Sequence, residues 1–89
     1  MLPFHKLSKK LWSEGDFALY IRRIRDLRED RDYTQTELAE YLHISQPAYS
    51  YYETGERAIP LELLILIARF YNVSIDYLLG ETDNPKRYE

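Results

Sequence analysis

Apolar side chains recur at helical spacings along most of this chain, and no segment alternates apolar and polar positions as a half-exposed strand does. The first predicted helix has Asp16 as its N-cap and continues to about Arg31, because its apolar residues stand three, four and seven positions apart. They are Phe17, Tyr20, Ile21, Ile24 and Leu27. Arginines and acids share the opposite face, which is typical either of a phosphate-binding stripe or of a solvated face neutralised by pairs such as Arg25 with Glu29.

Capping signals separate a second and a third short helix. Thr34 and Glu37 form a capping box, in which the threonine hydroxyl accepts the Glu37 N–H and the glutamate carboxylate accepts the Thr34 N–H. The second helix starts there and ends near His43. Ser45 is the N-cap of a third helix, which stops before Gly55.

Proline, serine and glycine bound the last two predicted helices. Pro60 stands in the favoured first-turn position of a fourth helix over residues 61–71. Ser74 caps a fifth helix over residues 75–79, which Gly80 closes. We therefore expect an all-α fold of five short helices. The chain then divides into an N-terminal arm, one domain and a polar C-terminal tail, over residues 1–15, 16–80 and 81–89.

The middle of the predicted domain, residues 34–53, consists of two short helices joined by a tight turn. This is helix-turn-helix geometry, in which the first helix braces against DNA phosphates and the second enters the major groove. Helices that cross steeply need a small side chain where they touch, and Ala39 supplies it.

Five separated motifs follow one another between Tyr20 and Gly80. They are Ile24-Arg25-Asp26-Leu27-Arg28-Glu29, Thr34-Gln35-Thr36-Glu37-Leu38-Ala39, Ile44-Ser45, Tyr52-Glu53-Thr54-Gly55-Glu56-Arg57 and Asp76-Tyr77-Leu78-Leu79-Gly80. In this order they resemble the Cro and phage-repressor type of helix-turn-helix regulators, the XRE-like family. The resemblance implies a compact, lambda-repressor-like domain of five helices that binds operator DNA and regulates transcription. We expect a sequence-specific repressor that acts as a homodimer on a palindromic operator with half-sites about 34 to 36 Å apart.

The resemblance also implies which side chains meet double-stranded DNA. Gln35 matches a phosphate contact, and its place at a helix N-terminus favours anions. Further phosphate candidates are Ser45, Arg57 and, on the first helix, Arg25. The base-reading positions fall on Gln46, Pro47, Ser50 and Tyr51, for which an ordinary hydrated helix face is the alternative. Arg28 and Glu53 match an ion pair that ties the first helix to the end of the third.

Two departures from the family pattern bear on the interface. His43 stands in the turn where the family most often has glycine, and histidine adopts positive φ less readily, so we expect a slightly altered turn. The third helix contains no arginine or lysine, so the common bidentate contact between arginine and guanine is not available from it. We therefore expect an operator rich in A·T pairs, or a heavy reliance on backbone contacts.

The fourth predicted helix has a second apolar stripe in addition to the face that the core needs. Leu63, Leu66 and Phe70 form this stripe, and an isolated domain would leave it wet. It is explained either by a second subunit or by the N-terminal arm, through Leu11 and Trp12.

Composition narrows the classes of function further. The chain has 89 residues and no cysteine, and its two histidines stand far apart, so we expect no metal site and no cofactor. No apolar stretch approaches the roughly 20 residues of a membrane span, and a cytoplasmic protein without membrane association is expected. No nucleophile stands with a base and an orienting carboxylate, so an enzyme is not expected, and no small-molecule ligand is evident.

The formal net charge of −3 first argues against a polyanionic partner. Residues 16–80 carry −4, whereas residues 1–15 carry +2 from Lys6, Lys9 and Lys10 against Glu14. Phosphates respond to charges within about 8 Å, so the total does not exclude DNA binding. The acidic total favours contacts through helix N-termini, Gln35, Arg57 and the lysines of the N-terminal arm, with weak non-specific binding. The alternative function is a protein-interaction module of the antitoxin or adaptor type on the same fold.

Overall fold

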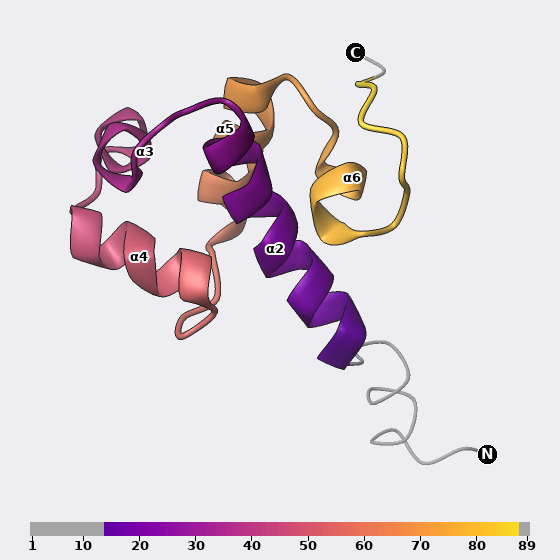
Figure 1. Ribbon diagram of the computed structural model, residues 1–89, viewed down its shortest axis with the longest axis horizontal. Coiled ribbons are helices and arrows are strands. Elements are labelled where there is room, and N and C mark those ends of the chain that lie inside the picture. Colours follow the sequence, from indigo (N-terminus) through magenta and orange to yellow (C-terminus); the bar gives the residue numbers. More distant parts are fainter. Residues whose placement is uncertain (1–13, 88–89) are drawn as a thin grey trace.

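The computed structural model describes residues 14–87, and within them the chain forms five helices and no strand. With the labels of Figure 1, they are α2 (Glu14–Asp30), α3 (Gln35–Leu42), α4 (Gln46–Thr54), α5 (Leu61–Tyr71) and α6 (Ile75–Leu79). The expected all-α class and the order of its helices are confirmed. In the same part of the chain, no helix combines the length and the apolar character needed to cross a membrane.

Three helices begin at the hydroxyl caps that the sequence predicts. The Thr34 hydroxyl accepts the Glu37 N–H at 3.1 Å, and the Glu37 carboxylate accepts the Thr34 N–H at 3.0 Å. Ser45 caps α4 by accepting the Ala48 N–H, and Ser74 caps α6 in the same way. Because each cap satisfies N–H groups that have no partner inside the helix, these starts are fixed by local chemistry.

The first helix departs from the prediction at its start. Asp16 is not an N-cap, because Glu14 and Gly15 are already helical and Asp16 lies inside α2. A glycine such as Gly15 costs a helix only about 1 kcal/mol, so local preference does not force the helix to start at Asp16. The remainder of the predicted arm lies outside the described residues, together with Leu11, Trp12 and the three arm lysines.

The turn between α3 and α4 has the left-handed conformation that a glycine would supply. His43 adopts φ 58° and ψ 41°, and its N–H reaches the carbonyl of Glu40. The Ile44 N–H then bonds to the carbonyl of Ala39 at 3.0 Å. Histidine therefore preserves the glycine-type turn rather than altering it, at the modest energetic cost of a side chain at positive φ.

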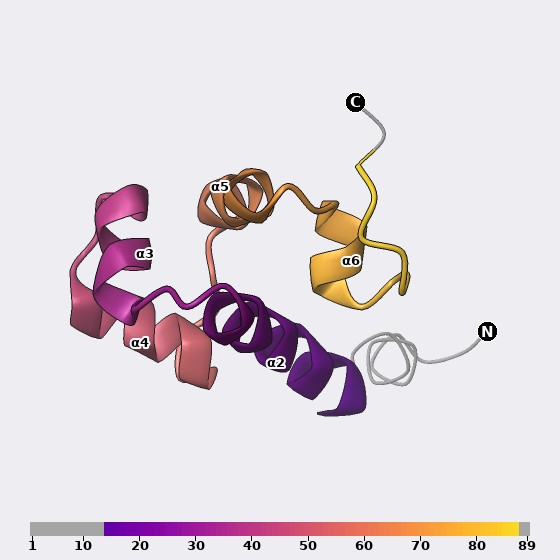
Figure 2. The same cartoon turned by 45° about the horizontal axis from the view of Figure 1, so that its top comes forward.

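A single core lies where all five helices meet. Its largest fully buried side chains come from each helix in turn: Ile24, Leu38, Tyr49, Ile67, Tyr71 and Leu78. Ala39 is only 2% exposed, as close helix packing in the helix-turn-helix unit requires. In Figure 1, α2 runs through the centre with α3 and α4 to one side and α6 to the other, and Figure 2 shows α5 on the opposite side of the molecule from α4. The face of α4 that is turned away from the core is thus left at the periphery.

The second stripe of α5 is half-buried within the chain itself. Leu63 and Leu66 pack against the core, and Phe70 lies beneath two tyrosine rings. The Phe70 ring centroid is 4.8 Å from that of Tyr33 and 4.6 Å from that of Tyr41. Part of the apolar area for which the sequence predicts a second subunit or the N-terminal arm as cover is therefore covered by aromatic residues of the described chain.

The segment after α6 folds back against α2 instead of leaving the domain. Arg23 donates to the carbonyl oxygens of Tyr77 and Thr82 and pairs with Asp83 at 2.7 Å. The guanidinium also lies over the Tyr77 ring, 4.2 Å from its centroid. The Arg23 side chain is only 12% exposed, so it does not belong to the solvated face predicted for the first helix.

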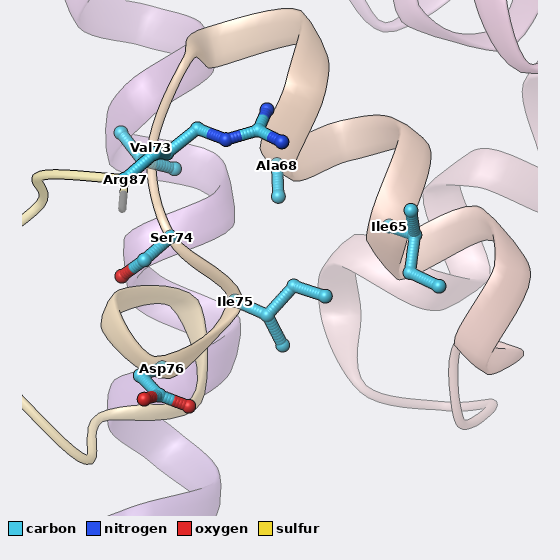
Figure 3. Close-up of a pocket in the computed structure, with 7 residues that line it drawn as sticks. All are labelled: Ile65, Ala68, Val73, Ser74, Ile75, Asp76 and Arg87. Atoms are coloured by element: carbon cyan, nitrogen blue, oxygen red, sulfur yellow. The ribbon is translucent and has the colours of Figure 1, made fainter. Parts of the chain in front are cut away.

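A hollow of about 250 Å³ lies between α5, the start of α6 and this C-terminal segment. Ile65 and Ala68 of α5 form one wall, Val73 and Ile75 form another, and Arg87 extends from the C-terminal segment toward α5 (Figure 3). The Ser74 N–H donates to the carbonyl of Pro85 at 2.9 Å and joins the start of α6 to the C-terminal segment. The C-terminal segment is thus packed as part of the domain.

Replacing Arg23 with methionine should loosen the C-terminal segment. Arg23→Met removes the donors to two backbone carbonyls while keeping most of the side-chain volume. We expect a loss of about 2 kcal/mol in the free energy of unfolding and faster hydrogen exchange at the Ser74 amide. Arg22→Met, at the exposed neighbouring position, is the matched control and should change neither. An unchanged exchange rate at Ser74 in Arg23→Met would contradict the role given to Arg23.

Candidate nucleic-acid interface

The N-termini of α3 and α4 are joined by their own side chains. Gln46 is the first residue of α4, and its side-chain Nε2 donates to the side-chain oxygen Oε1 of Gln35 at 2.7 Å. Gln35 is the first residue of α3, so the unsatisfied N–H groups of both helix starts lie near this glutamine pair. A helix N-terminus carries a partial positive charge, and two together favour an anion between or beside them.

A buried ion pair supports the glutamine pair from inside. Arg28 donates to both carboxylate oxygens of Glu53, from Nε at 2.9 Å and from Nη2 at 2.7 Å. Its remaining nitrogen donates to the carbonyl of Tyr33 at 2.9 Å. Gln35 Nε2 lies 3.3 Å from Glu53 Oε1 and donates to it. Hydrogen bonds therefore run without a break from Arg28 through Glu53 and Gln35 to Gln46, and we call these four residues the polar row.

Glu53 is charged although it is only 4% exposed. Burial by itself raises the pKa of this carboxyl group, but the hydrogen bonds, chiefly from Arg28, outweigh burial and hold the pKa below its ordinary value. The same contact with Glu53 raises the pKa of Arg28. Burial, and then the nearby carboxylate, raise the pKa of Tyr49, whose hydroxyl makes no hydrogen bond of good geometry within residues 14–87. Arg28 and Glu53 thus both stay ionised at neutral pH.

The four base-reading candidates all lie on α4, but their side chains differ in solvent exposure. Gln46, Pro47 and Tyr51 are exposed, whereas Ser50 is half-buried. Pro47 occupies the first turn, where it removes no intrahelical hydrogen bond. The exposed face of α4 therefore offers one amide, one proline ring and one tyrosine.

The phosphate candidates are less uniform. Ser45 is exposed, but its hydroxyl is used as the cap of α4. Arg25 is exposed on α2 and lies 3.5 Å from the Glu29 carboxylate, which already neutralises part of its charge. Gln35 is half-buried in the polar row, and Arg57 is exposed in the loop after α4. The structure therefore brings Gln35 and Gln46 together, whereas Arg25 stays on the exposed face of α2, next to Glu29 of the same helix.

The sequence does not predict three of the contacts at this surface, which are those of Gln46 with Gln35, of Gln35 with Glu53 and of Arg57 with Tyr51. The motifs assign Arg57 and Tyr51 to separate DNA contacts, but the Arg57 guanidinium lies over the Tyr51 ring, 4.7 Å from its centroid. A glycine stop followed by arginine indicates a reversal of the chain, yet which ring the arginine meets depends on the path of that reversal.

The sequence of residues 24–78 matches a family described as "Helix-turn-helix". The chain belongs to this family. Its helix-turn-helix unit is the α3–α4 pair, and the match extends from α2 into α6. The resemblance to helix-turn-helix regulators, drawn from separated motifs, is thereby confirmed.

Relatives of this helix-turn-helix chain include named regulators. It is 42% identical over 67 residues to the uncharacterized HTH-type transcriptional regulator YobD of Bacillus subtilis, covering 75% of the chain and 60% of YobD. It is 34% identical over 65 residues to the cryptic phage CTXphi transcriptional repressor RstR of Vibrio cholerae, covering 73% of the chain and 59% of RstR. It is 37% identical over 60 residues to the antitoxin PezA of Streptococcus pneumoniae, covering 67% of the chain and 38% of PezA.

The chain thus spans at most about 60% of the length of these relatives. No solved structure matches it significantly.

Removing the charge of Glu53 should destabilise the domain in a pH-dependent way. Glu53→Gln leaves Arg28 without its carboxylate, and we expect a loss of about 3 kcal/mol in the free energy of unfolding at neutral pH. The pKa of Glu53 is lower in the folded protein than in the unfolded chain. The charge of Glu53 therefore adds to the free energy of unfolding above the ordinary glutamate pKa of about 4.3, and this stabilisation is lost as the pH falls through the folded-state pKa. The difference between wild type and Glu53→Gln should therefore shrink below about pH 4, as urea denaturation at several pH values would show. Glu56→Gln, at an exposed glutamate nearby, is the control, and a difference independent of pH would contradict the assignment.

Proposed function

We propose that this chain is the DNA-binding domain of a cytoplasmic transcriptional repressor that places α4 in the major groove of double-stranded DNA. The observation that carries the proposal is the Gln35–Gln46 hydrogen bond, which joins two helix starts at the outer end of the helix-turn-helix unit. Membership of the helix-turn-helix family and relatives named as transcriptional regulators support it. The function is one of binding, not of catalysis.

In this proposal the two glutamines divide the work at the interface. Gln46 gives one amide hydrogen to Gln35 and keeps a second hydrogen and its carbonyl oxygen, the donor and acceptor that adenine N7 and N6 need. Gln35 keeps one amide hydrogen for a phosphate oxygen. Since Gln35 holds Gln46 through its own carbonyl, a phosphate contact at Gln35 fixes the orientation of the base-reading amide.

The remaining contacts follow from the exposed face of α4. Pro47 is apolar and suits a thymine methyl group, while Ser50 and Tyr51 offer hydroxyl groups to base edges or the backbone. Ser45, Arg57 and Arg25 are the further phosphate candidates. Since α4 contains no arginine or lysine, an operator rich in A·T pairs fits this surface best.

We further propose that the domain acts as a homodimer through α5. Leu63, Leu66 and Phe70 are half-buried, and Leu61 at the start of the same helix is 66% exposed. A homodimer would read a palindromic operator whose half-sites lie about 34 to 36 Å apart, one with each copy of α4. The N-terminal arm is the other candidate for covering this stripe.

A second candidate function is a protein-interaction module of the antitoxin or adaptor type. The identity to the antitoxin PezA favours it. The salt dependence of duplex binding distinguishes the two, because a regulator that neutralises phosphates loses affinity steeply as salt rises, whereas an interaction module binds duplex weakly at any salt concentration.

Selection of bound duplexes from a random pool tests the DNA proposal. The wild type should enrich a motif, and Gln46→Ala should lose the preference at one adenine and weaken binding to the selected duplex by about 1 to 3 kcal/mol. Glu40→Gln, at an exposed residue of α3 outside the contact set, is the control for the change of a polar side chain. No enriched motif would contradict sequence-specific binding, and a motif unaffected by Gln46→Ala would contradict the role of Gln46.

The dimer is tested by sedimentation of Leu66→Glu. A charge at the centre of an apolar interface should dissociate the dimer, so we expect the mass of a monomer where the wild type sediments as a dimer. Glu62→Gln, at an exposed residue of the same helix, is the control. A dimer mass retained by Leu66→Glu would remove this stripe from the interface.

A further inference from the structure

The helix α4 has no cationic residue of its own, but the fold returns one to it. Arg57 stands three residues beyond the last residue of α4, and its guanidinium carbon lies 4.7 Å from the centroid of the Tyr51 ring. Tyr51 lies in the middle of α4 and is 38% exposed, on the face for which DNA contacts are proposed. A positive charge is thus held against the side of a helix that lacks one.

The backbone between the two residues explains this arrangement. Gly55 adopts φ 84°, a left-handed conformation that reverses the chain directly after α4. The Arg57 N–H then donates to the Tyr51 carbonyl at 3.2 Å, which holds the loop against the last turn of the helix. The main chain therefore places the start of the Arg57 side chain, and the ring selects one direction for a side chain that otherwise has many rotamers.

The charge of Arg57 is not neutralised by its neighbours. Within residues 14–87, Arg23, Arg25 and Arg28 each have a carboxylate oxygen within 4 Å, whereas Arg57 has none. Stacking covers one flat face of a guanidinium and leaves the N–H groups at its edge available as donors. Those donors suit the paired oxygens of a phosphate group.

We propose that Tyr51 is a positioning residue, whose ring holds Arg57 for contact with a phosphate of the DNA backbone beside α4. This proposal rests on the proposed function and changes the part played by Tyr51, from a hydroxyl that contacts DNA directly to a ring that orients a cation. Arg57 then belongs to the DNA-contacting surface of α4, although it lies outside the helix.

The salt dependence of duplex binding separates this role from a merely structural one. The probe is the duplex that the wild type enriches, and the measured quantity is the slope of log Kobs against log[salt], which loses about one unit per lost phosphate contact. When the salt concentration rises from about 50 to about 200 mM, a slope that is one unit less steep means that the duplex loses about fourfold less affinity. We expect Arg57→Ala to reduce the steepness by about one unit and Tyr51→Leu to reduce it by most of that amount.

Three further measurements make the comparison specific. Tyr51→Phe keeps the ring and should restore the wild-type slope, whatever affinity the lost hydroxyl costs. Tyr51→Leu in the Arg57→Ala background should reduce the slope no further. Arg69→Ala removes an exposed arginine from α5, outside the proposed DNA-contact residues, and controls for the change in net charge. Circular dichroism checks that each variant is helical, with Tyr51→Gln as the substitute if Tyr51→Leu is not.

Each result has one meaning. A wild-type slope in Tyr51→Leu, with a reduced slope in Arg57→Ala, overturns the positioning role and leaves the proposed function intact. A slope in Tyr51→Phe as low as that in Tyr51→Leu assigns the effect to the hydroxyl and also overturns it. A wild type that binds no duplex at any salt concentration overturns the proposed function, and the positioning role with it.

Discussion

The buried ion pair between Arg28 and Glu53 connects the parts of this domain that matter for its surface. It joins α2 to the last turn of α4 through two short hydrogen bonds, and through Gln35 it reaches the start of α3. A charge taken out of water is costly unless it is paired and hydrogen-bonded, so the two helices are held at the one relative position that satisfies both groups. The orientation of the exposed glutamines therefore depends on a pair that lies beneath them.

The acidic balance of the chain has a structural explanation. Glu53 is neutralised by Arg28, Glu29 lies against Arg25, and Asp83 is paired with Arg23. Glu37 is used at the start of α3, where its charge is favourable. Several acidic side chains are thus paired within the domain. Among the residues described, Arg57 has no carboxylate within 4 Å. The net charge of −3 is consequently a poor guide to the field at α4.

Aromatic side chains have two different uses in this small domain. Phe70 is enclosed by Tyr33, Tyr41 and Tyr71, with ring centroids 4.6 to 5.0 Å apart, so a stripe that looks available for a partner is partly covered by the chain itself. Tyr77 and Tyr51 instead carry arginines on their faces. In the first case a ring fills apolar space, and in the second it directs a charge.

The sequence by itself determined the helices, because their ends depend on contacts between residues three or four positions apart. The capping serines and threonine, the glycines that end α4 and α6 and the apolar faces could be recognised there. Three details were wrong: Asp16 lies inside α2, His43 keeps the glycine-type turn, and Pro60 is the N-cap of α5 instead of a first-turn residue. Apart from the Arg28–Glu53 pair, which the family resemblance implies, only the tertiary structure decided which side chains meet. Arg23 binds the C-terminal segment 59 residues away, Gln46 meets Gln35 across the turn, and Arg57 reaches Tyr51. These contacts depend on how the helices cross, which is set by the packing of the whole core and by no local pattern.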